Sequence, residues 1–324
     1  MPFAIRIHRT GGPEVMCREE IDVADPAPAE ARVRHRAVGL NYIDIYHRSG
    51  LYPLPLPSGL GLEASGIVEA VGSTVSELRP GDRVAYAGGP VGAYSEVRCL
   101  PADRLVKLPE SIDFPTAAAM MLQGLTSAYL LLRTYPVRAG DVVLIHAAAG
   151  GVGLIACQWA KALGATVIGT VSSTAKAELA AANGCDHVID YTREDFARRV
   201  REITGGEGVA VVYDGVGKDT FAGSLDSLRT CGLLVSFGNA SGPVPAFDPL
   251  LLSQKGSLFL TRPTLMHYTA RRDDLVALAG QLFEVVESGR VNIAVRQTYP
   301  LAGVADAHRD LEGRKLSGST VLLP

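Results

Sequence analysis

A run of small residues near the middle of the chain has the form of a phosphate-binding turn. The apolar stretch Val142–Ile145 leads into alanines and glycines, and a helix-like segment follows. Ala148 stands in the first glycine position of the dinucleotide fingerprint, Gly150 lets the backbone approach a pyrophosphate, and Gly153 allows close packing of helix and strand. The helix N-terminus adds unpaired N–H groups and partial positive charge. The pattern predicts dinucleotide binding; a tight turn that binds nothing is the alternative.

The end of the next expected strand indicates which dinucleotide is bound. NAD sites usually carry Asp or Glu about 20 residues past the first glycine, to hold the ribose 2′-OH. Here Ser172 and Lys176 follow the strand, and no acid occurs before Glu178. One charge-assisted bond to a 2′-phosphate contributes roughly 1.5–3 kcal/mol, which is about a 10- to 100-fold preference. NADPH is therefore favoured, although Lys176 by itself could be a solvated lysine on a helix face.

The segment from about Met121 to Arg262 alternates strands and helices. Strands are expected at Val142–His146, Thr166–Thr170, His187–Asp190, Val209–Asp214, Leu233–Phe237 and Ser257–Leu260. Helices are expected at about Val152–Leu163, Ala175–Asn183, Asp195–Ile203 and Thr220–Leu228. This alternation predicts parallel pairing, and the apolar strands fit a sheet covered on both faces. The fold class is therefore α/β, with a doubly wound parallel sheet of six strands.

The beginning of the chain has a different pattern. Short strand-like runs, such as Arg32–Val38 and Ser65–Val71, are separated by Gly/Pro turns and indicate a compact β-rich domain. After Pro263 a helix is expected at about Arg271–Ser288, and the chain ends in the strand-like run Ser319–Leu323. We therefore expect residues 1–120 and 264–324 to form one β-rich domain, into which a nucleotide-binding domain of residues 121–263 is inserted.

Several separate stretches carry a resemblance to a known family. They are Gly11–Val15, Gly39–Asp44, Arg48–Pro53, Gly59–Gly66, Ala147–Ala165, Val211–Asp214, Val235–Asn239 and Thr261–Pro263. Through them the chain resembles, over essentially its whole length, bacterial NADPH:quinone oxidoreductases related to zeta-crystallin, which are zinc-free members of the medium-chain dehydrogenase/reductase superfamily. The resemblance implies a GroES-like β-rich domain, a Rossmann domain and a homodimer built through the nucleotide-binding sheets.

The resemblance also assigns site residues. It places Asn41 and Gln123 toward the nicotinamide end of the cofactor and counts Thr126 among the cofactor-binding residues. Tyr46 and Tyr52 would lie beside the quinone, so that the expected catalytic residues are Asn41, Tyr46 and Tyr52. The expected pyrophosphate contacts are Ala149, Gly150, Gly151, Val152 and Gly153. Ser172, Lys176 and Tyr191 would surround the 2′-phosphate, and Phe237, Asn239, Arg262 and Arg314 would complete the cofactor cleft. The chain departs from close relatives at Gln123, where lysine also occurs, and at Gly215, where serine also occurs.

The residues at the zinc position of the superfamily argue against a metal. The alcohol dehydrogenases carry cysteine where this chain has Asn41, and histidine next to glutamate where it has Leu62-Glu63. Asp44, His47 and Glu63 survive nearby without the ligand pattern of a catalytic zinc site, which needs about three protein ligands. A quinone accepts hydride readily, so positioning beside the nicotinamide can supply most of the catalysis, and Asn41, Tyr46 or Tyr52 can steady the developing phenolate. Each tyrosine has a packing role as its alternative.

Bulk composition excludes several function classes. A net charge of −3 gives no reason to expect nucleic-acid or membrane attraction. The N-terminal residues lack the apolar core of a signal peptide, and no stretch is long and apolar enough to span a membrane. The five cysteines are scattered, which suits a reducing compartment, so a cytoplasmic location is expected.

Other chemistry-bearing residues are interpreted as structural. Trp159 and Cys157 are expected in the core, His146 is expected to be packed or hydrogen-bonded, and Arg198, Arg199, Arg201 and Arg271-Arg272 are expected on solvated faces. The sequence thus predicts an NADPH-dependent quinone reductase. Two alternatives stay open: a reductase of α,β-unsaturated ketones or aldehydes, and an NADPH-binding protein without a catalytic role.

Overall fold

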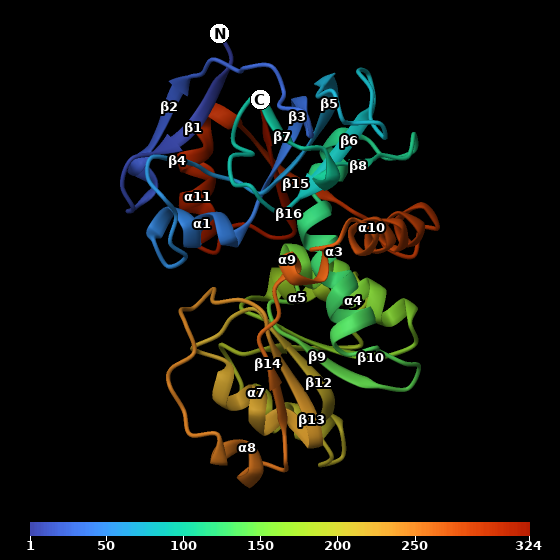
Figure 1. The fold of residues 1–324 in the computed structure, drawn as a ribbon. Coiled ribbons are helices and arrows are strands. Elements are labelled where there is room, and N and C mark those ends of the chain that lie inside the picture. The colour runs from blue at the N-terminus through green and yellow to red at the C-terminus, as the bar shows by residue number, and fades with distance from the viewer. The chain divides into compact units, whose positions relative to one another are not determined.

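The computed structural model describes all residues from Met1 to Pro324. The chain divides into two compact units (Figure 1). The first contains residues 1–125, 268–287 and 293–324, and the second contains residues 126–267 and 288–292. The second unit is thus inserted in the chain of the first, and each is described separately below.

The inserted unit is built on a six-stranded parallel sheet in the order β11-β10-β9-β12-β13-β14. Its strands are β9 (Val142–Ile145), β10 (Thr166–Val171), β11 (His187–Asp190), β12 (Val209–Asp214), β13 (Leu228–Ser236) and β14 (Phe259–Thr261). Figure 1 shows most of them side by side. The predicted fold class, with its doubly wound six-stranded sheet, is confirmed.

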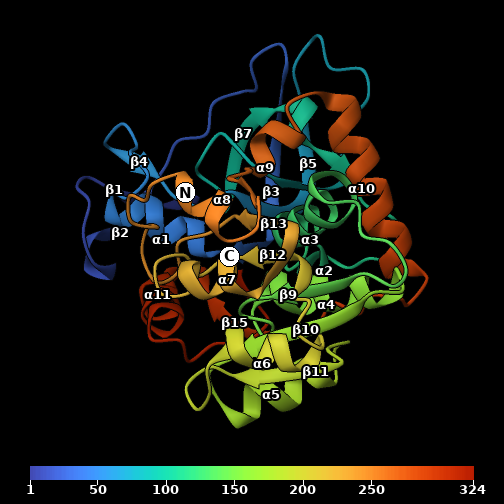
Figure 2. The ribbon, with the colours of Figure 1, turned by 90° about the horizontal axis from the view of Figure 1, so that it is seen from below.

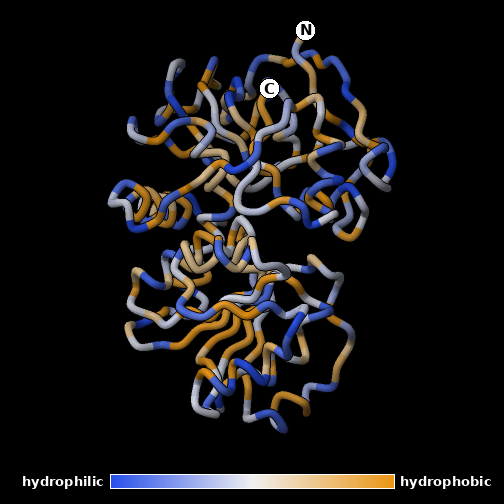
Figure 3. The backbone as a smooth tube through the Cα atoms, turned by 180° about the vertical axis from the view of Figure 1, so that it is seen from behind, coloured by the Kyte–Doolittle hydropathy of each residue, from blue (hydrophilic) through white to orange (hydrophobic).

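Helices pack on this sheet. They are α4 (Gly151–Ala162), α5 (Thr174–Ala181), α6 (Phe196–Ile203), α7 (Phe221–Ser227) and α8 (Leu250–Gln254), preceded by the π-helical turn η3 (Leu130–Thr134). Helix α4 packs on β9 and β10, α5 packs on β10 and β11 (Figure 2), and α7 packs on β12 and β13. Figure 3 shows that these strands are made of hydrophobic residues, as expected for strands that are buried on both faces. Leu144, Ile168 and Val212 are fully buried in one core cluster.

The first unit contains two sheets. A three-stranded sheet has the order β2-β1-β4, and a seven-stranded sheet has the order β15-β16-β3-β5-β6-β8, with β7 also paired to β3. The strands are β1 (Phe3–Ile7), β2 (Met16–Glu20), β3 (Glu30–Leu40), β4 (Ser58–Gly59), β5 (Glu63–Val71), β6 (Arg83–Ala87), β7 (Val97–Pro101), β8 (Val106–Lys107), β15 (Val295–Pro300) and β16 (Ser319–Leu323). All these pairs are antiparallel except β15 with β16. The C-terminal strand β16 therefore lies between β15 and β3 and joins the end of the chain to the seven-stranded sheet.

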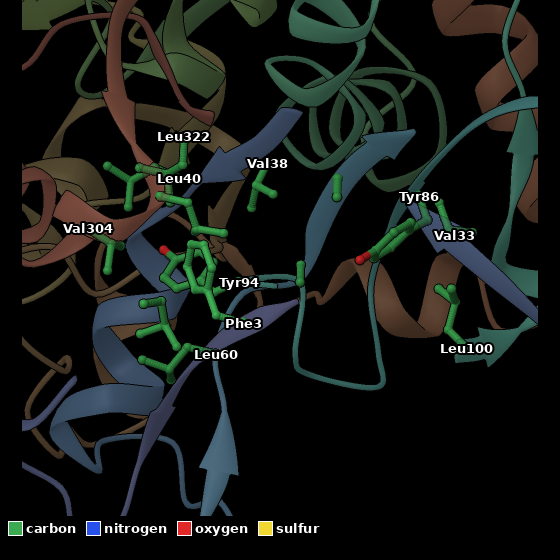
Figure 4. Close-up of a cluster of buried hydrophobic side chains, with 14 of the residues drawn as sticks. Phe3, Val33, Val38, Leu40, Leu60, Tyr86, Tyr94, Leu100, Val304 and Leu322 are labelled. Carbon is green, nitrogen blue, oxygen red and sulfur yellow. The ribbon is translucent and has the colours of Figure 1, made fainter. Parts of the chain in front are cut away.

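Short helices link these strands. They are α1 (Tyr42–Ser49), α2 (Phe114–Ala118), α3 (Met121–Tyr129, which runs into the inserted unit), α9 (Leu265–Tyr268, at the second crossing), α10 (Arg272–Glu287), α11 (Val304–Glu312) and the 3-10 turns η1 (Pro13–Val15), η2 (Ala102–Arg104) and η4 (Leu301–Gly303). Side chains from β1, β3, β16 and α11 meet in one core, where Figure 4 shows Phe3, Leu40, Val304 and Leu322 around Tyr94. No helix has the length and apolar character needed to cross a membrane.

Three expectations about the fold were wrong in detail. Strand β13 begins at Leu228 rather than Leu233, because Leu228 pairs with Val209 before an irregularity at Cys231, which has φ 57°. The Arg201 guanidinium is not simply solvated, since it donates to the carbonyl oxygens of Asp226, Gly206, Glu207 and Leu228 at 2.7–3.0 Å. Arg272 likewise donates to the Leu105 carbonyl at 2.6 Å.

Candidate functional site

The turn after β9 has the close packing that its small residues predicted. Ala147 adopts a left-handed backbone with φ 52°, and its carbonyl accepts a hydrogen bond of 2.8 Å from the Gly150 N–H. Gly150 is the N-cap of α4. A Cβ on Gly153 would lie 2.2 Å from the Ala147 oxygen. Only glycine therefore lets the first turn of α4 sit this close to the strand end, and the N–H groups there can receive an anion.

The residues of α4 beyond the turn belong to the core. Trp159 is 4% exposed and Cys157 is fully buried, as predicted. The Cys157 and Cys185 sulfur atoms lie 3.3 Å apart. Hydrogen bonding with Cys185, together with burial, raises the pKa of the Cys157 thiol, so this thiol is held in its unreactive protonated form. These two thiols are packing groups, as Trp159 is.

The three residues expected around a 2′-phosphate follow neighbouring strands. Ser172 comes directly after β10, Tyr191 comes directly after β11, and the Tyr191 N–H donates to the Val171 carbonyl at 3.1 Å. Lys176 is half-buried in the first turn of α5, where its N–H donates to the Ser173 hydroxyl. The chain ends of β10 and β11 thus bring hydroxyl and ammonium groups to one edge of the sheet.

Sequence reasoning missed a further cation at this edge. Arg193 donates from Nη2 to the Thr174 hydroxyl at 3.4 Å, next to the N-cap of α5, and its Nε lies 3.5 Å from Asp190. Its place two residues beyond Tyr191 was the available signal. The Asp190 carboxylate offsets part of its charge.

A buried polar network supports the strand ends from inside the sheet. The Asp214 carboxylate accepts hydrogen bonds from the N–H groups of Val216 and Gly217 and from the Thr220 hydroxyl. His146 lies 2.8 Å from the Thr170 hydroxyl and 3.0 Å from the Ser224 hydroxyl, which itself donates to Asp214. Burial lowers the pKa of His146, and the nearby Asp214 charge opposes this shift. The predicted packed, hydrogen-bonded role of His146 is confirmed.

The last two strands place the remaining expected cofactor residues of this unit. Phe237 follows β13 and Arg262 follows β14, and Arg262 donates from Nη1 to the Ser236 carbonyl at 2.7 Å. Asn239 lies in the same loop as Phe237. A Cβ on Gly215 would come within 3.0 Å of the Phe237 ring, so a serine at this position would press on that ring. All these residues lie where open parallel sheets bind ligands, at the carboxyl ends of the strands.

In the first unit Asn41 is the centre of a buried polar group. It is 5% exposed and caps α1. Its Oδ1 accepts a hydrogen bond of 3.1 Å from Gln123 Nε2, and its Nδ2 donates to Glu63 Oε2 at 2.6 Å. The structure therefore brings Asn41 and Gln123 together, as expected, and adds Glu63. Thr126, also buried, comes three residues after Gln123 in α3 and is the first residue of the inserted unit.

The expected tyrosines form an aromatic group on and after α1. The Tyr46 ring lies 5.1 Å from that of Tyr52 and 5.6 Å from that of Tyr42, between ring centroids. Tyr46 is buried and Tyr52 is half-buried. Burial raises the pKa of Tyr42, and the exposed Arg314 guanidinium opposes this rise. Tyr46 and Tyr52 are thus brought together, and Arg314 lies close enough to the adjacent Tyr42 to influence its pKa.

A second buried network supports α1 and was not foreseen. Asp44 Oδ2 accepts from the Asn41 N–H and from the Tyr94 hydroxyl, both at 2.9 Å, and this hydroxyl lies 3.0 Å from His308. Burial, opposed by the hydrogen bonds from Asn41 and Tyr94, raises the pKa of Asp44 to about 7, whereas burial together with the Arg48 charge lowers the pKa of His308 to about 3. Asp44 Oδ1 and His47 Nδ1 are buried without a hydrogen-bond partner.

The residues at the superfamily's zinc position do not fit a zinc ion. Both Glu63 oxygens are occupied, by Asn41 Nδ2 and by the Leu122 N–H at 2.7 Å. The Asn41 carboxamide stands where a thiolate ligand would be needed. No group of three or more His, Cys, Asp and Glu side chains is arranged to hold a metal ion.

Comparison with known proteins gives matches over the whole chain. Residues 27–110 match the alcohol dehydrogenase GroES-like domain, and residues 151–279 match the zinc-binding dehydrogenase family. The chain is 58% identical to a quinone oxidoreductase of Pseudomonas aeruginosa, over 100% of both chains. It is 47% identical to a 2-haloacrylate reductase of a Burkholderia species, over 100% of this chain and 99% of the relative. The crystal structure of Escherichia coli quinone oxidoreductase complexed with NADPH superposes with a TM-score of 0.98 at 51% identity, covering 99% of this chain and 100% of that one.

A GroES-like β-rich unit and an inserted Rossmann sheet with a glycine-rich turn define a medium-chain dehydrogenase/reductase. Within that superfamily, the chain belongs to the quinone oxidoreductase family.

Proposed function

We propose that the protein is an NADPH-dependent quinone reductase that works without zinc. The observation that carries the proposal is the combination of a dinucleotide-binding turn with the buried Asn41 carboxamide at the position where zinc enzymes of the superfamily place a metal ligand. The relatives that are 58% and 51% identical are named quinone oxidoreductases, and one was solved with NADPH. A conjugated, electron-poor acceptor such as a quinone fits this site, because it can accept hydride without a metal once it is held beside the nicotinamide.

The inserted unit would hold the cofactor, and the GroES-like unit would carry the substrate side. The turn residues Ala149, Gly150, Gly151, Val152 and Gly153 would hold the pyrophosphate at the N-terminus of α4, where the Gly150 N–H is already bonded to the Ala147 carbonyl. Ser172, Lys176 and Tyr191 would bind the 2′-phosphate, where the ammonium group favours NADPH over NADH. Gln123, Thr126, Phe237, Asn239, Arg262 and Arg314 would make the remaining cofactor contacts.

Bound NADPH supplies the hydride, and the chain's own residues provide position and charge stabilisation. The Asn41 carboxamide, fixed by buried partners, would orient the reacting groups. The hydroxyl groups of Tyr46 and Tyr52 would donate hydrogen bonds to the oxyanion that develops on a quinone oxygen. Preorganised donors of this kind act strongly where water is excluded.

A second acceptor class is favoured by a specific observation. The relative that is 47% identical over the whole chain is named a 2-haloacrylate reductase, and a haloacrylate carries a carbon–carbon double bond conjugated to a carboxylate. Reduction of α,β-unsaturated carbonyl compounds would use the same positioned hydride. The two classes separate by product analysis, because an enone yields the saturated carbonyl compound.

We also propose a cytoplasmic homodimer built through the nucleotide-binding sheets. Strand β14 is the edge of the six-stranded sheet, and its Phe259 is 61% exposed. An exposed aromatic side chain on an unpaired sheet edge suits pairing with a second copy. The net charge of −3 gives no support for nucleic-acid or membrane partners.

The test is oxidation of the reduced nicotinamide, followed by absorbance with a panel of quinones, enones and alcohols. The proposal expects rapid turnover of quinones with NADPH, at least several-fold above NADH and insensitive to a chelator. Turnover of enones but not quinones would establish the second acceptor class instead. Tight NADPH binding without turnover of either would leave a binding protein without a catalytic role.

A further inference from the structure

The Asn41 carboxamide is one link in a longer chain of buried hydrogen bonds. The Ser319 hydroxyl donates to Gln123 Oε1 at 2.7 Å, and Gln123 Nε2 donates to Asn41 Oδ1 at 3.1 Å. Asn41 Nδ2 donates to Glu63 Oε2 at 2.6 Å, and the Leu122 N–H donates to the other Glu63 oxygen at 2.7 Å. Ser319, Gln123 and Asn41 are 5%, 7% and 5% exposed, and Glu63 is fully buried. Water therefore has little access to these groups.

The pairing of the strands brings these residues together. In the seven-stranded sheet, β3 lies between β16 and β5. Leu40 pairs with Thr320, which places Ser319 near the end of β3 and hence near Asn41. Val38 pairs with Ala64, which places Glu63 beside Gly39. The chain of hydrogen bonds is therefore set by the register of three strands.

Glycine at position 39 makes room for the carboxylate. A Cβ there would lie 2.1 Å from Glu63 Oε2 and 2.4 Å from the Ala118 carbonyl oxygen. Any side chain at this position would push Glu63 away from Asn41. The β3 backbone at Gly39 therefore packs directly against the Glu63 carboxylate and fixes its position.

All the hydrogen bonds in this series run in the same donor-to-acceptor direction, and this direction fixes the orientation of the Asn41 carboxamide. Each donor points toward the Glu63 carboxylate. If the Asn41 carboxamide turned over, its oxygen would face Glu63 and its NH₂ group would face the Gln123 NH₂ group, so that two attractive contacts would become repulsive. Hydrogen bonds to an ionised acceptor are about twice as strong as neutral ones, and linked hydrogen bonds strengthen one another.

We propose that Glu63 and Ser319 are positioning residues that hold the Asn41 carboxamide in the one orientation that the proposed hydride transfer uses. The catalytic consequence of this inference rests on the proposed function. The orientation of the Asn41 carboxamide does not, because it is set by hydrogen bonds that exist without cofactor or substrate. Neither residue needs to touch substrate or cofactor. Glu63 acts through Asn41, and Ser319 acts through Gln123.

The protonation state of Glu63 gives the proposal a distinctive signature. The pKa of Glu63 is raised to about 8; burial is the main cause, the hydrogen bonds from Asn41 and Leu122 oppose the rise, and the nearby Asp44 adds to it. The other titratable groups that feel Glu63 are Tyr86 and Tyr94, and burial raises the pKa of both above the usual tyrosine value. A proton on Glu63 replaces an accepted hydrogen bond by a donated one. The orientation is therefore held best above pH 8 and loosens as the pH falls.

The first experiment observes the free protein by nuclear magnetic resonance. The Asn41 side-chain NH₂ signals are assigned by their loss in Asn41→Asp. We expect one of these protons downfield of the ordinary amide range at pH 9, moving upfield as the pH falls through about 8, and already upfield at pH 9 in Glu63→Gln. Signals that do not change with pH or with the Glu63→Gln substitution would overturn the proposed hold on Asn41, whatever the activity of the protein.

The second experiment compares quinone turnover in Glu63→Gln, Ser319→Ala and the control Ser95→Ala. Ser95 is a buried serine of the same unit, and its hydroxyl donates to the Gly92 carbonyl, outside this chain of hydrogen bonds. From the strength of one charge-assisted and one neutral hydrogen bond, kcat at pH 9, where Glu63 is ionised, should fall about 10- to 100-fold in Glu63→Gln and about 3- to 10-fold in Ser319→Ala. The NADPH dissociation constant, from fluorescence titration, should change less than kcat, because the pyrophosphate and 2′-phosphate contacts are untouched, and Ser95→Ala should resemble the wild type.

The pH profile separates positioning from a merely structural loss. The wild-type kcat should rise with pH through about 8, and this limb should be absent in Glu63→Gln. If Glu63→Gln does not fold, Ser319→Ala should still show a lowered kcat at each pH with the limb retained. A wild type that reduces no quinone would remove the proposed function, and an active wild type with unchanged kcat in Ser319→Ala would overturn this inference alone.

Discussion

Replacing Gly153 by alanine tests the role of the turn at the start of α4. The new Cβ would lie 2.2 Å from the Ala147 carbonyl oxygen and 2.8 Å from two Ala148 backbone atoms. Carbon–oxygen contacts normally need about 3.3 Å or more, so the helix and the turn must separate by about 1 Å. Overpacking of this kind costs ~1–3 kcal/mol, and it lies at the upper end here because backbone atoms cannot rotate away. The higher helix propensity of alanine returns ~1 kcal/mol.

The net expectation for Gly153→Ala is a loss of about 1–2 kcal/mol in the free energy of unfolding, from the two terms above. This corresponds to a melting midpoint lower by roughly 2–8 °C. NADPH binding should weaken on the order of 10- to 100-fold, because the N–H groups move by about 1 Å from the pyrophosphate position. Calorimetry and fluorescence titration measure the two effects.

Gly280 provides a matched control in α10. A Cβ there would meet nothing within 4 Å. Gly280→Ala should therefore stabilise the protein by ~0.4–1 kcal/mol through lower entropy of the unfolded chain, with NADPH binding unchanged. Equal stability and equal NADPH affinity of Gly153→Ala and the wild type would refute the close-packing account of the turn.

Three further predictions concern other parts of the molecule. Lys176→Ala should weaken NADPH about 10- to 100-fold by loss of one charge-assisted hydrogen bond, while NADH affinity changes little; equal losses for both nucleotides in titrations would contradict a 2′-phosphate contact. Cys17 and Cys231 are exposed, Cys99 is half-buried with a pKa raised mainly by burial, and Cys157 and Cys185 are buried, so a thiol reagent should label two groups quickly, a third slowly and the last two only on unfolding. Phe259→Glu should shift the mass measured by light scattering from dimer toward monomer, and an unchanged dimer would place the interface elsewhere.

The inserted sheet could be predicted from sequence because each of its strands is a separate apolar run. His187–Asp190 and Val209–Asp214 were expected with the observed bounds. Strand β13 was not, because its first residues pair with Val209 before an irregular stretch at Cys231. Helix α1 was missed for a different reason: its aromatic and β-branched residues have low helix propensity, and tertiary packing overrides that preference.

The glycine turn could also be predicted, since strand, turn and helix are contiguous in the chain. The contacts of Glu63 with Asn41 and of Ser319 with Gln123 could not be predicted, because these residues come from strands that only the register of the sheet brings together. Arg201 and Arg272 show the same limit, since backbone carbonyls from other segments hold their charged groups. Sequence therefore predicts a site whose residues are contiguous, such as the glycine turn. Contacts between residues on different strands depend on the topology and register of the sheet.

The most direct test of the account is the rate of NADPH oxidation by the purified protein with a quinone, in the presence and absence of a chelator. The account predicts rapid oxidation that the chelator does not change, several-fold faster than with NADH. No oxidation with any quinone, or oxidation abolished by the chelator, would contradict a zinc-free quinone reductase.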